Sequence, residues 1–318
     1  MTLPPQADQY RSPDGVPVLA SHESELGLDS DFSPEPQSQW KLFRKRFFRH
    51  KVAVIALLLL ILITFCCFAV GWLSPFDPNR QDLLAKPVGP NGTHWLGTDE
   101  LGRDQLARIL KSGQLSLKIG FSIAILSVAL GTAIGAIAGF FGKWADQGLM
   151  RLTDLFLVVP ELAILAVALN YWGSTDIVII LVLTGLFWMS VARVVRGQVL
   201  AIREKEFVEA ARAAGATPWR IIVRHIIPNI IGPIMVNTTL AVTAAIITES
   251  TLSFLGFGVQ PPQSSWGKML SDAEGYVGTS KAYLIYGPGL AILITVLCVN
   301  FIGDGLRDAF DPQSEKHS

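Results

Sequence analysis

EFVEAARAAGATPWR, residues 206–220, is a charged and alanine-rich segment between two long uncharged stretches of a chain of 318 residues. The stretch before it covers residues 177–192 and the stretch after it covers 226–248, and neither contains Asp, Glu, Lys or Arg. A helix that crosses the hydrocarbon core of a bilayer needs about 20 apolar residues. We therefore expect residues 206–220 to lie outside the bilayer and to connect two membrane spans.

The rest of the chain repeats this pattern. Residues 52–76, 119–142 and 282–303 are also free of charged side chains, and residues 155–175 contain one acid, Glu161. The sequence predicts an all-α polytopic membrane protein with six transmembrane helices. The expected spans are roughly 52–72, 119–141, 155–171, 177–195, 227–248 and 283–303.

The charges outside the spans predict their direction. Residues 193–226 carry seven bases against three acids, and WKLFRKRFFRHK, residues 40–51, carries six bases and no acid. Bases concentrate on the cytoplasmic side, so both termini are expected there. Aromatic residues between bases also occur in nucleic-acid sites. This cluster adjoins a span, however, so we expect residues 40–51 to contact the lipid bilayer and not nucleic acid. The expected organisation is a disordered cytoplasmic tail at 1–39, a basic segment and first span at 40–73, an extracytoplasmic loop at 74–115, a transmembrane core at 116–304 and a cytoplasmic tail at 305–318.

The segment 206–220 has an amphipathic pattern. At 100° per residue, Phe207, Ala210, Ala211 and Ala214 share one face of a helix. Helices that bind a bilayer surface usually present large apolar side chains, whereas this face is shallow and suits a groove on another protein. Lys205, Glu209 and Arg212 fall on the opposite face.

A sharp corner is expected after this helix. Gly215 is a typical residue at a helix C-terminus, Thr217 is a typical N-cap, and Pro218 fits the first turn of the next helix. Pro228 and Pro233 predict kinks where the chain enters the next span. The alternative is an ordinary loop helix, and the spacing alone does not exclude it.

Catalytic motifs are scarce in the sequence. It contains no G-x-x-x-x-G-K-[ST], H-E-x-x-H or G-x-S-x-G pattern, and KSGQLSL at 111–117 is only a faint match to an ATPase signature. Glu161, after Pro160, is a candidate for the pathway or a gate because a carboxylate within a span is costly; the alternative is a solvated position near the inner interface.

Gly131, Gly135 and Gly139 recur every four residues, which favours close helix packing either within the chain or between subunits.

Residues 209–228 resemble the EAA motif of permease subunits of binding-protein-dependent ABC importers. Glu209-Ala210-Ala211 is followed after three residues by Gly215, and the segment ends at Ile227-Pro228. The general motif has isoleucine where this chain has His225; in the peptide-transport branch a histidine there, followed by a proline–asparagine pair, is usual. The resemblance implies the type I importer fold and a coupling helix at 203–215 that fits a cleft on a cytoplasmic ATPase. The implied coupling residues are Phe207, Glu209, Ala210, Ala211, Ala214 and Gly215, and the implied turn and membrane entry are Thr217, Pro218, His225, Pro228 and Asn229.

Three more stretches are similar to the C-type permease of dipeptide and oligopeptide importers. They are HWLGTDELGRD at 94–104, SFLGFGVQPPQSSWGKML at 253–270 and GDGLRDAFDP at 303–312, so the resemblance covers roughly residues 40–312. It implies a bacterial inner-membrane subunit with a homologous B-type permease, one or two ATPases that bind ATP and magnesium, and an extracytoplasmic solute-binding protein. Relatives of this kind also carry nickel, glutathione, opines or haem, so these substrates stay open beside peptides.

The outer loops are expected either to meet the binding protein or to pack over the outer mouth. The residues are Gly256, Gly258, Pro261, Pro262, Trp266 and Gly267; glycines supply turns, prolines stiffen the loop, and Trp266 suits a membrane interface.

We expect no catalytic residue, cofactor or metal in this chain. A stand-alone channel or secondary carrier is disfavoured by the scarcity of charges in the spans, and an intramembrane enzyme lacks nucleophile–base or metal-ligand spacing.

Overall fold

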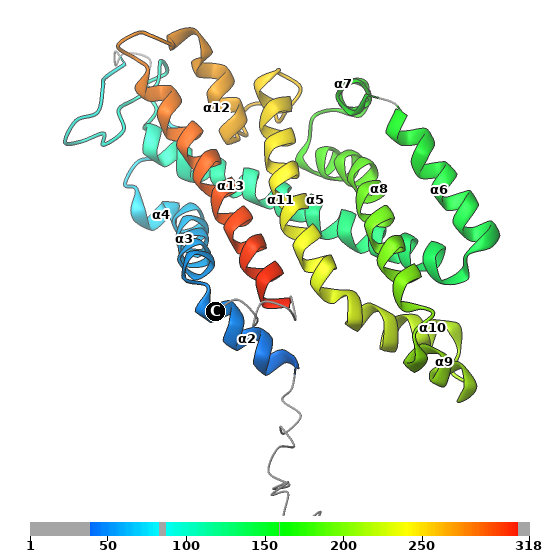
Figure 1. Cartoon of the computed structure of the whole chain (residues 1–318). Coiled ribbons are helices and arrows are strands. Elements are labelled where there is room, and N and C mark those ends of the chain that lie inside the picture. Colours follow the sequence, from blue (N-terminus) through cyan, green and yellow to red (C-terminus); the bar gives the residue numbers. More distant parts are fainter. Residues whose placement is uncertain (1–38, 83–86, 159, 311–318) are drawn as a thin grey trace, which may run out of the picture. The chain divides into compact units, whose positions relative to one another are not determined.

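The computed structural model describes residues 39–82, 87–158 and 160–310, and this part of the chain is helical with a single isolated β-bridge, Thr98 to Asp104. The expected disordered tail at 1–39 lies outside the described residues except for its last one. Residues 44–318 form one compact unit, and the description below concerns its described part (Figure 1). The helices are α2 (Gln39–Arg49), α3 (Lys51–Phe68), α4 (Val70–Leu73), α5 (Gln105–Phe141), α6 (Lys143–Val158), α7 (Glu161–Trp172), α8 (Asp176–Ile202), α9 (Glu206–Ala213), α10 (Pro218–Ile221), η1 (Ile222–Ile226), η2 (Ile227–Ile230), α11 (Ile231–Phe254), α12 (Trp266–Ala273), η3 (Glu274–Tyr276) and α13 (Tyr283–Phe310).

Helices α5 and α8 form the most extensive helix pair of the unit. A Cβ added at Gly131 would lie 2.6 Å from the carbonyl oxygen of Trp188, and one at Gly135 would collide with the carbonyl oxygen of Ala192. Gly139 meets Val199 in the same way, at 2.8 Å. The glycine repeat therefore serves packing within the chain, because only glycine lets the two backbones approach this closely.

The register of this pair also shows that α5 and α8 are parallel, because positions that increase along α5 meet positions that increase along α8. The chain between them must therefore return from the end of α5 to the start of α8. Helices α6 and α7 provide this return, and they are bent by 83° with respect to each other. Among the described residues, five helical segments, one of them the composite Pro218–Phe254, are long and apolar enough to cross a membrane, and the bent pair counts as a sixth when it is taken as one span.

The third predicted span, 155–171, falls on two helices, α6 and α7, rather than on one. The helix breaks before Pro160, which is the N-cap of α7, and Glu161 lies exposed in the first turn of α7. Helix α6 ends at Val158 and α7 begins at Glu161. The role of Pro160 and Glu161 in a pathway or gate stays a prediction.

The other five predicted spans are confirmed, with different ends. Helix α5 begins at Gln105 rather than near residue 119, because Asp104 caps it by accepting a hydrogen bond from the amide of Ala107 at 2.8 Å. Helices α8 and α13 extend to Ile202 and Phe310, beyond the expected ends at 195 and 303. Helical structure continues past the apolar segment, since charged side chains on a last turn are compatible with a helix.

Contacts between helix ends define two sides of the molecule. At one side, His50 before α3 lies 3.5 Å from Asp308 near the end of α13, and the start of α11 meets Phe310. At the other side, Lys118 of α5 pairs with Asp176 at the start of α8 at 2.7 Å. Figure 1 places α9 and α10 at the first side and α12 at the second. We call these the α9 side and the α12 side.

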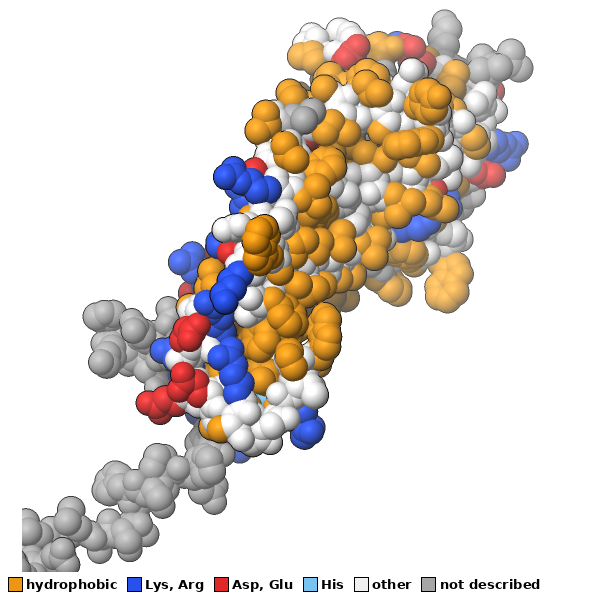
Figure 2. Space-filling view, turned by 90° about the vertical axis from the view of Figure 1, so that its right-hand side faces the viewer, with side chains coloured by type: hydrophobic (Ala, Val, Ile, Leu, Met, Phe, Trp, Pro, Cys, Tyr) orange, Lys and Arg blue, Asp and Glu red, His pale blue; other side chains and the backbone are white. Residues whose placement is uncertain are grey.

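Hydrophobic side chains cover much of the surface between the two sides. Figure 2 shows them gathered across one face, with charged side chains near its margins. Helix α6 contributes strongly exposed residues such as Leu155, 69% exposed, and Val158, 83% exposed. Apolar surface of this extent is unfavourable in water and suits contact with lipid or another membrane subunit.

Candidate functional site

Two groups of residues stand out, one on each side of the molecule. The first is the short helix α9 with the corner after it. Glu206 and Glu209 lie in its first turn and Arg212 in its last, an arrangement that the helix dipole favours. These charges help to stabilise α9, which is shorter than the expected range of 203–215.

Val208 is the buried side chain that holds α9 on the rest of the protein. Val208 is fully buried and packs in a cluster with Val199 of α8 and Ile222 and Ile226 of η1. Ala211, one turn later, packs against the same cluster while remaining half-buried. Burial of a valine stabilises a contact by about 1.5–3 kcal/mol, so α9 is held on the ends of the spans.

The predicted apolar face of α9 is divided between the protein and the surface. Of its four members only Ala211 turns toward the protein, and Val208 takes the buried position instead. Phe207, Ala210 and Ala214 are exposed side by side on the neighbouring strip of the helix. The structure thus leaves a shallow apolar strip open, with Phe207 as its one large side chain, 42% exposed.

The corner after α9 is built as the sequence predicts. Gly215 has φ +77°, in the left-handed region, and donates its amide to the carbonyl of Arg212 at 2.9 Å. Thr217 accepts a hydrogen bond from the amide of Arg220 at 3.4 Å, and Pro218 occupies the first turn of α10. The guanidinium of Arg212 also lies over the ring of Phe140, 5.3 Å from its centre, which connects α9 to the end of α5.

The path from the corner into the membrane is helical but irregular. A π-helical turn over Ile222–Ile226 is followed by a 3-10 turn over Ile227–Ile230, and only then does α11 begin. Asn229 donates its side-chain amide to the carbonyl of His225 at 2.6 Å. Proline at 228 has no amide hydrogen to donate, so the asparagine side chain supplies a hydrogen bond where the regular pattern is interrupted.

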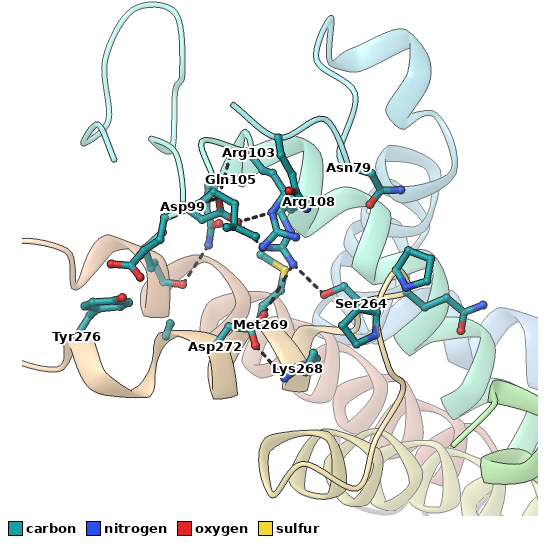
Figure 3. Close-up of a pocket in the computed structure, with 18 residues that line it drawn as sticks. Asn79, Asp99, Arg103, Gln105, Arg108, Ser264, Lys268, Met269, Asp272 and Tyr276 are labelled. Carbon is teal, nitrogen blue, oxygen red and sulfur yellow. Dashed lines mark hydrogen bonds and ion pairs between the residues drawn. The ribbon is translucent and has the colours of Figure 1, made fainter. Parts of the chain in front are cut away.

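The second group lies on the α12 side and surrounds a cavity of about 640 Å³ (Figure 3). Asp99 is its central acid: one carboxylate oxygen accepts from Arg103 Nε at 2.7 Å and from Arg108 at 2.5 Å. Arg108 also reaches Ser264 Oγ at 3.4 Å and lies 3.9 Å from Asp272. Arg108 is almost completely buried, so one side chain of α5 ties together three separate segments.

The sequence suggests that Trp266 lies at a membrane interface, but the structure buries it inside the protein. It is 1% exposed, and its indole Nε1 donates to the carbonyl of Ile109 at 2.9 Å. Its backbone amide donates to Ser116 Oγ at 3.1 Å. Of the two interpretations of the outer loops, packing within the chain is thus the one seen at Trp266.

The other predicted loop residues have distinct positions. Gly256 has φ +87° and makes the turn after α11. Gly258 and Gly267 lie so close to Ser253 and Ser250 that any Cβ would collide with them. Pro261 and Pro262 line the cavity.

One buried acid escaped the sequence analysis. Glu249 of α11 is 1% exposed and accepts a hydrogen bond from Ser253 Oγ at 2.8 Å, while Ser253 Oγ lies 3.1 Å from Ser265 Oγ. Glu249 directly follows the uncharged stretch 226–248, so the expected span of 227–248 ends just before it. A serine four residues after it was the available signal, since i and i+4 side chains meet on a helix.

Beyond the spans, a surface ion pair joins two loops. Lys281 lies 2.9 Å from Glu100. Hydrogen bonds from Tyr276 and then Lys281 hold the pKa of Glu100 below its ordinary value. The same bonding raises the pKa of both Tyr276 and Lys281. The pair therefore carries full charge at neutral pH.

The fold and the two sites define a polytopic helical membrane component with a protruding helix on one side. Residues 131–316 match the family described as "Binding-protein-dependent transport system inner membrane component", and residues 38–90 match "N-terminal TM domain of oligopeptide transport permease C". The chain belongs to the first of these families, whose model covers more than half of it.

Similar proteins are known in several bacteria. The oligopeptide transport system permease protein OppC of Haemophilus influenzae is 40% identical over 310 residues, 97% of each chain. The protein of the same name from Mycobacterium bovis is 39% identical over 279 residues, 87% of this chain and 96% of its own.

The fold also matches a solved transporter. Two structures of inward-facing conformations of the MetNI methionine ABC transporter align with TM-scores of 0.52 and 0.54, at 18% and 19% identity. Each alignment covers 64% of this chain and 96% or 97% of the other. The importer permease fold implied by the sequence motifs is therefore confirmed.

Proposed function

We propose that this chain is a permease subunit of an ABC importer for di- and oligopeptides and forms half of the translocation pathway. Membership of the family and the permease names of its relatives support a transport role. The peptide substrate rests on the oligopeptide names of relatives about 40% identical over nearly the whole chain. A related solute such as nickel, glutathione or haem is the alternative substrate.

The observation that carries the coupling role is the geometry of α9. Its apolar strip of Phe207, Ala210 and Ala214 is exposed, while Val208 holds the helix on the spans. The corner at Gly215 then leads through α10 and the irregular turns into α11 without a flexible linker. Force applied to α9 by a docked ATPase is thereby transmitted to a membrane span.

The proposed complex contains a homologous B-type permease, one or two ATPase subunits and a solute-binding protein that delivers peptide to the α12 side. ATP and magnesium bind to the ATPases, and this chain contributes no catalytic residue or cofactor. The α9 side faces the cytoplasm of a bacterial cell, in agreement with the bases of residues 193–226 and of α2. Both ends of the membrane core then lie on the cytoplasmic side.

The test is co-purification followed by uptake. The ATPase subunits should remain with the chain in mild detergent, and the reconstituted complex should take up labelled peptide when ATP is supplied. Glu209→Lys and Gly215→Pro should abolish uptake while the protein still inserts. In Gly215→Pro the corner is lost because proline cannot adopt φ +77°. Glu274→Lys, a charge reversal of an exposed acid on the α12 side, is the control. Uptake that persists in both α9 variants would rule out the coupling role, and uptake without any ATPase would indicate a secondary carrier.

A further inference from the structure

A polar stripe on α5 has no part in the sites described so far. Lys111, Gln114 and Lys118 are spaced by three and four residues in the segment KSGQLSLK, so they share one face of the helix. They line a second cavity of about 470 Å³, next to the one in Figure 3. Asn79, Arg108 and Ser264, labelled in that figure, line both cavities. The volume is in the range typical of sites for small molecules.

The charges in this second cavity do not balance. Three bases and one acid line it: Arg108, Lys111, Lys118 and Asp176. Lys118 pairs with Asp176 at 2.7 Å, and Arg108 pairs with Asp99 outside the cavity. Among the described residues no carboxylate lies within ion-pair distance of Lys111. One positive charge is therefore available to an anion.

Lys111 is an exposed side chain that is hydrogen-bonded to its neighbour on α5. Gln114 donates its side-chain amide to the carbonyl of Cys67 at 2.7 Å, and its oxygen accepts from Lys111 Nζ at 3.0 Å. An ammonium group has three hydrogens to donate, so two remain after this bond. This bond restrains Lys111 before a ligand binds, which lowers the entropy cost of holding one.

The rest of the lining suits a peptide. Gln114, Gln263 and Asn79 offer side-chain amides, which can both donate to and accept from a peptide backbone. Phe68 and Leu115 add apolar surface for side chains. A cation, amides and apolar groups in one cavity match the carboxylate, backbone and side chains of a peptide end.

The depth of Lys111 agrees with access from the α12 side. Thirty residues of α5 separate it from Phe141 at the opposite end. At 1.5 Å per residue this distance is about 45 Å, more than the ~30 Å hydrocarbon core. Lys111 also precedes the uncharged stretch 119–142, so it lies toward the end of α5 where a delivered solute would first meet the membrane subunit.

We propose that this cavity binds the C-terminal carboxylate of the transported peptide, and that Lys111 is the residue that recognises it. The assignment rests on the proposed transport function and specifies which chemical group of the substrate this chain recognises. It makes Lys111 a specificity-determining residue for free carboxylate ends over blocked ones.

The experiment uses the complete importer with its ATPases and binding protein in proteoliposomes at pH 7. Uptake of labelled trialanine is compared with uptake of trialanine amide, for the unchanged chain, Lys111→Met, Lys111→Arg and the control Lys143→Met. We expect Lys111→Met to lower the preference for the free acid by about three- to tenfold, as for loss of one partly exposed charged hydrogen bond. Lys111→Arg and Lys143→Met should keep the preference. The binding protein is the same throughout, so its own selectivity cancels in the comparison.

Each remaining outcome is decisive. An equal loss of uptake for both peptides in Lys111→Met, or an unchanged preference in that variant and in a second neutral variant, Lys111→Gln, would overturn the assignment. A loss that occurs only in vesicles containing phosphatidylglycerol, and not in phosphatidylcholine alone, would identify a phospholipid headgroup as the ligand instead. Absence of uptake of either peptide by the unchanged chain would contradict the proposed function rather than the role of Lys111.

Discussion

Asn229 and His225 are joined by a side-chain-to-backbone hydrogen bond of 2.6 Å, in the segment where α10 passes through a π turn and a 3-10 turn into α11. The bond spans one turn of the helical path and sits next to Pro228, which donates none. It stabilises the element that connects the exposed helix α9 with a membrane span. The proline–asparagine pair thus has a structural role that follows from its own chemistry.

Replacement of Asn229 by leucine should weaken this connection. The side chain keeps a similar volume but loses its donor, which costs about 0.5–1.5 kcal/mol for a typical hydrogen bond. We expect a lower thermal midpoint of the purified complex and less peptide uptake for each ATP hydrolysed. Asn170→Leu, at an exposed asparagine of α7, is the matched control. Unchanged coupling in Asn229→Leu would show that the bond is dispensable.

Close contact between α5 and α8 makes Gly135 sensitive to any side chain. Gly135→Ala would press a methyl group into the carbonyl of Ala192 and within 2.9 Å of Val195 Cβ. Overpacking of this kind costs about 1–3 kcal/mol, so we expect a clearly lower thermal midpoint. Gly185→Ala on α8, where nothing lies within 4 Å, should be neutral or slightly stabilising. Equal effects of the two substitutions would contradict the packing.

Buried Glu249 should be replaceable by glutamine but not by leucine. Glutamine keeps an oxygen that can accept from Ser253, whereas leucine leaves that buried hydroxyl without its acceptor. An unsatisfied buried polar group costs about 1–3 kcal/mol. The measurement is the fraction of chain that assembles with its partners in detergent, with Glu274→Leu at an exposed acid as control. Equal assembly of the glutamine and leucine variants would exclude a role for this bond.

A pH effect is expected at the surface pair of Glu100 and Lys281. The folded-state pKa of Glu100 is below its unfolded value, so the contact stabilises the loops above the unfolded pKa and is lost as pH falls through the folded pKa. The window therefore lies below 4.5, the ordinary value. Hydrogen exchange of residues 276–284, corrected for intrinsic rates, should increase in that window. The increase should be absent in Lys281→Met, where the contact is already lost.

The sequence predicts most of the architecture because the decisive signals are local. An uncharged stretch of sufficient length predicts a span by itself, and Gly215, Thr217 and Pro218 act on their own turns. Such features depend on neighbouring residues only, so they survive in any tertiary context.

The remaining features depend on residues distant in the sequence. Periodicity shows that α9 has an apolar face, but the contact with η1 decides that Val208, not Phe207, is buried. The site around Arg108 joins α5 to segments more than 150 residues away, which no spacing rule predicts. The acid Glu249 was missed because a window that looks for uncharged residues ends where the first charge occurs.

The glycines of α5 restrict how this molecule can move. With backbone against backbone along α8, the two helices cannot slide past each other without a collision, so we expect them to travel as one rigid body. That body carries Lys111 at one end and meets Arg212 of α9 through Phe140 at the other. A covalent cross-link between α5 and α8 should therefore leave transport intact. Peptide binding at one end and coupling to the ATPase at the other would then be connected by one rigid helix pair across the membrane.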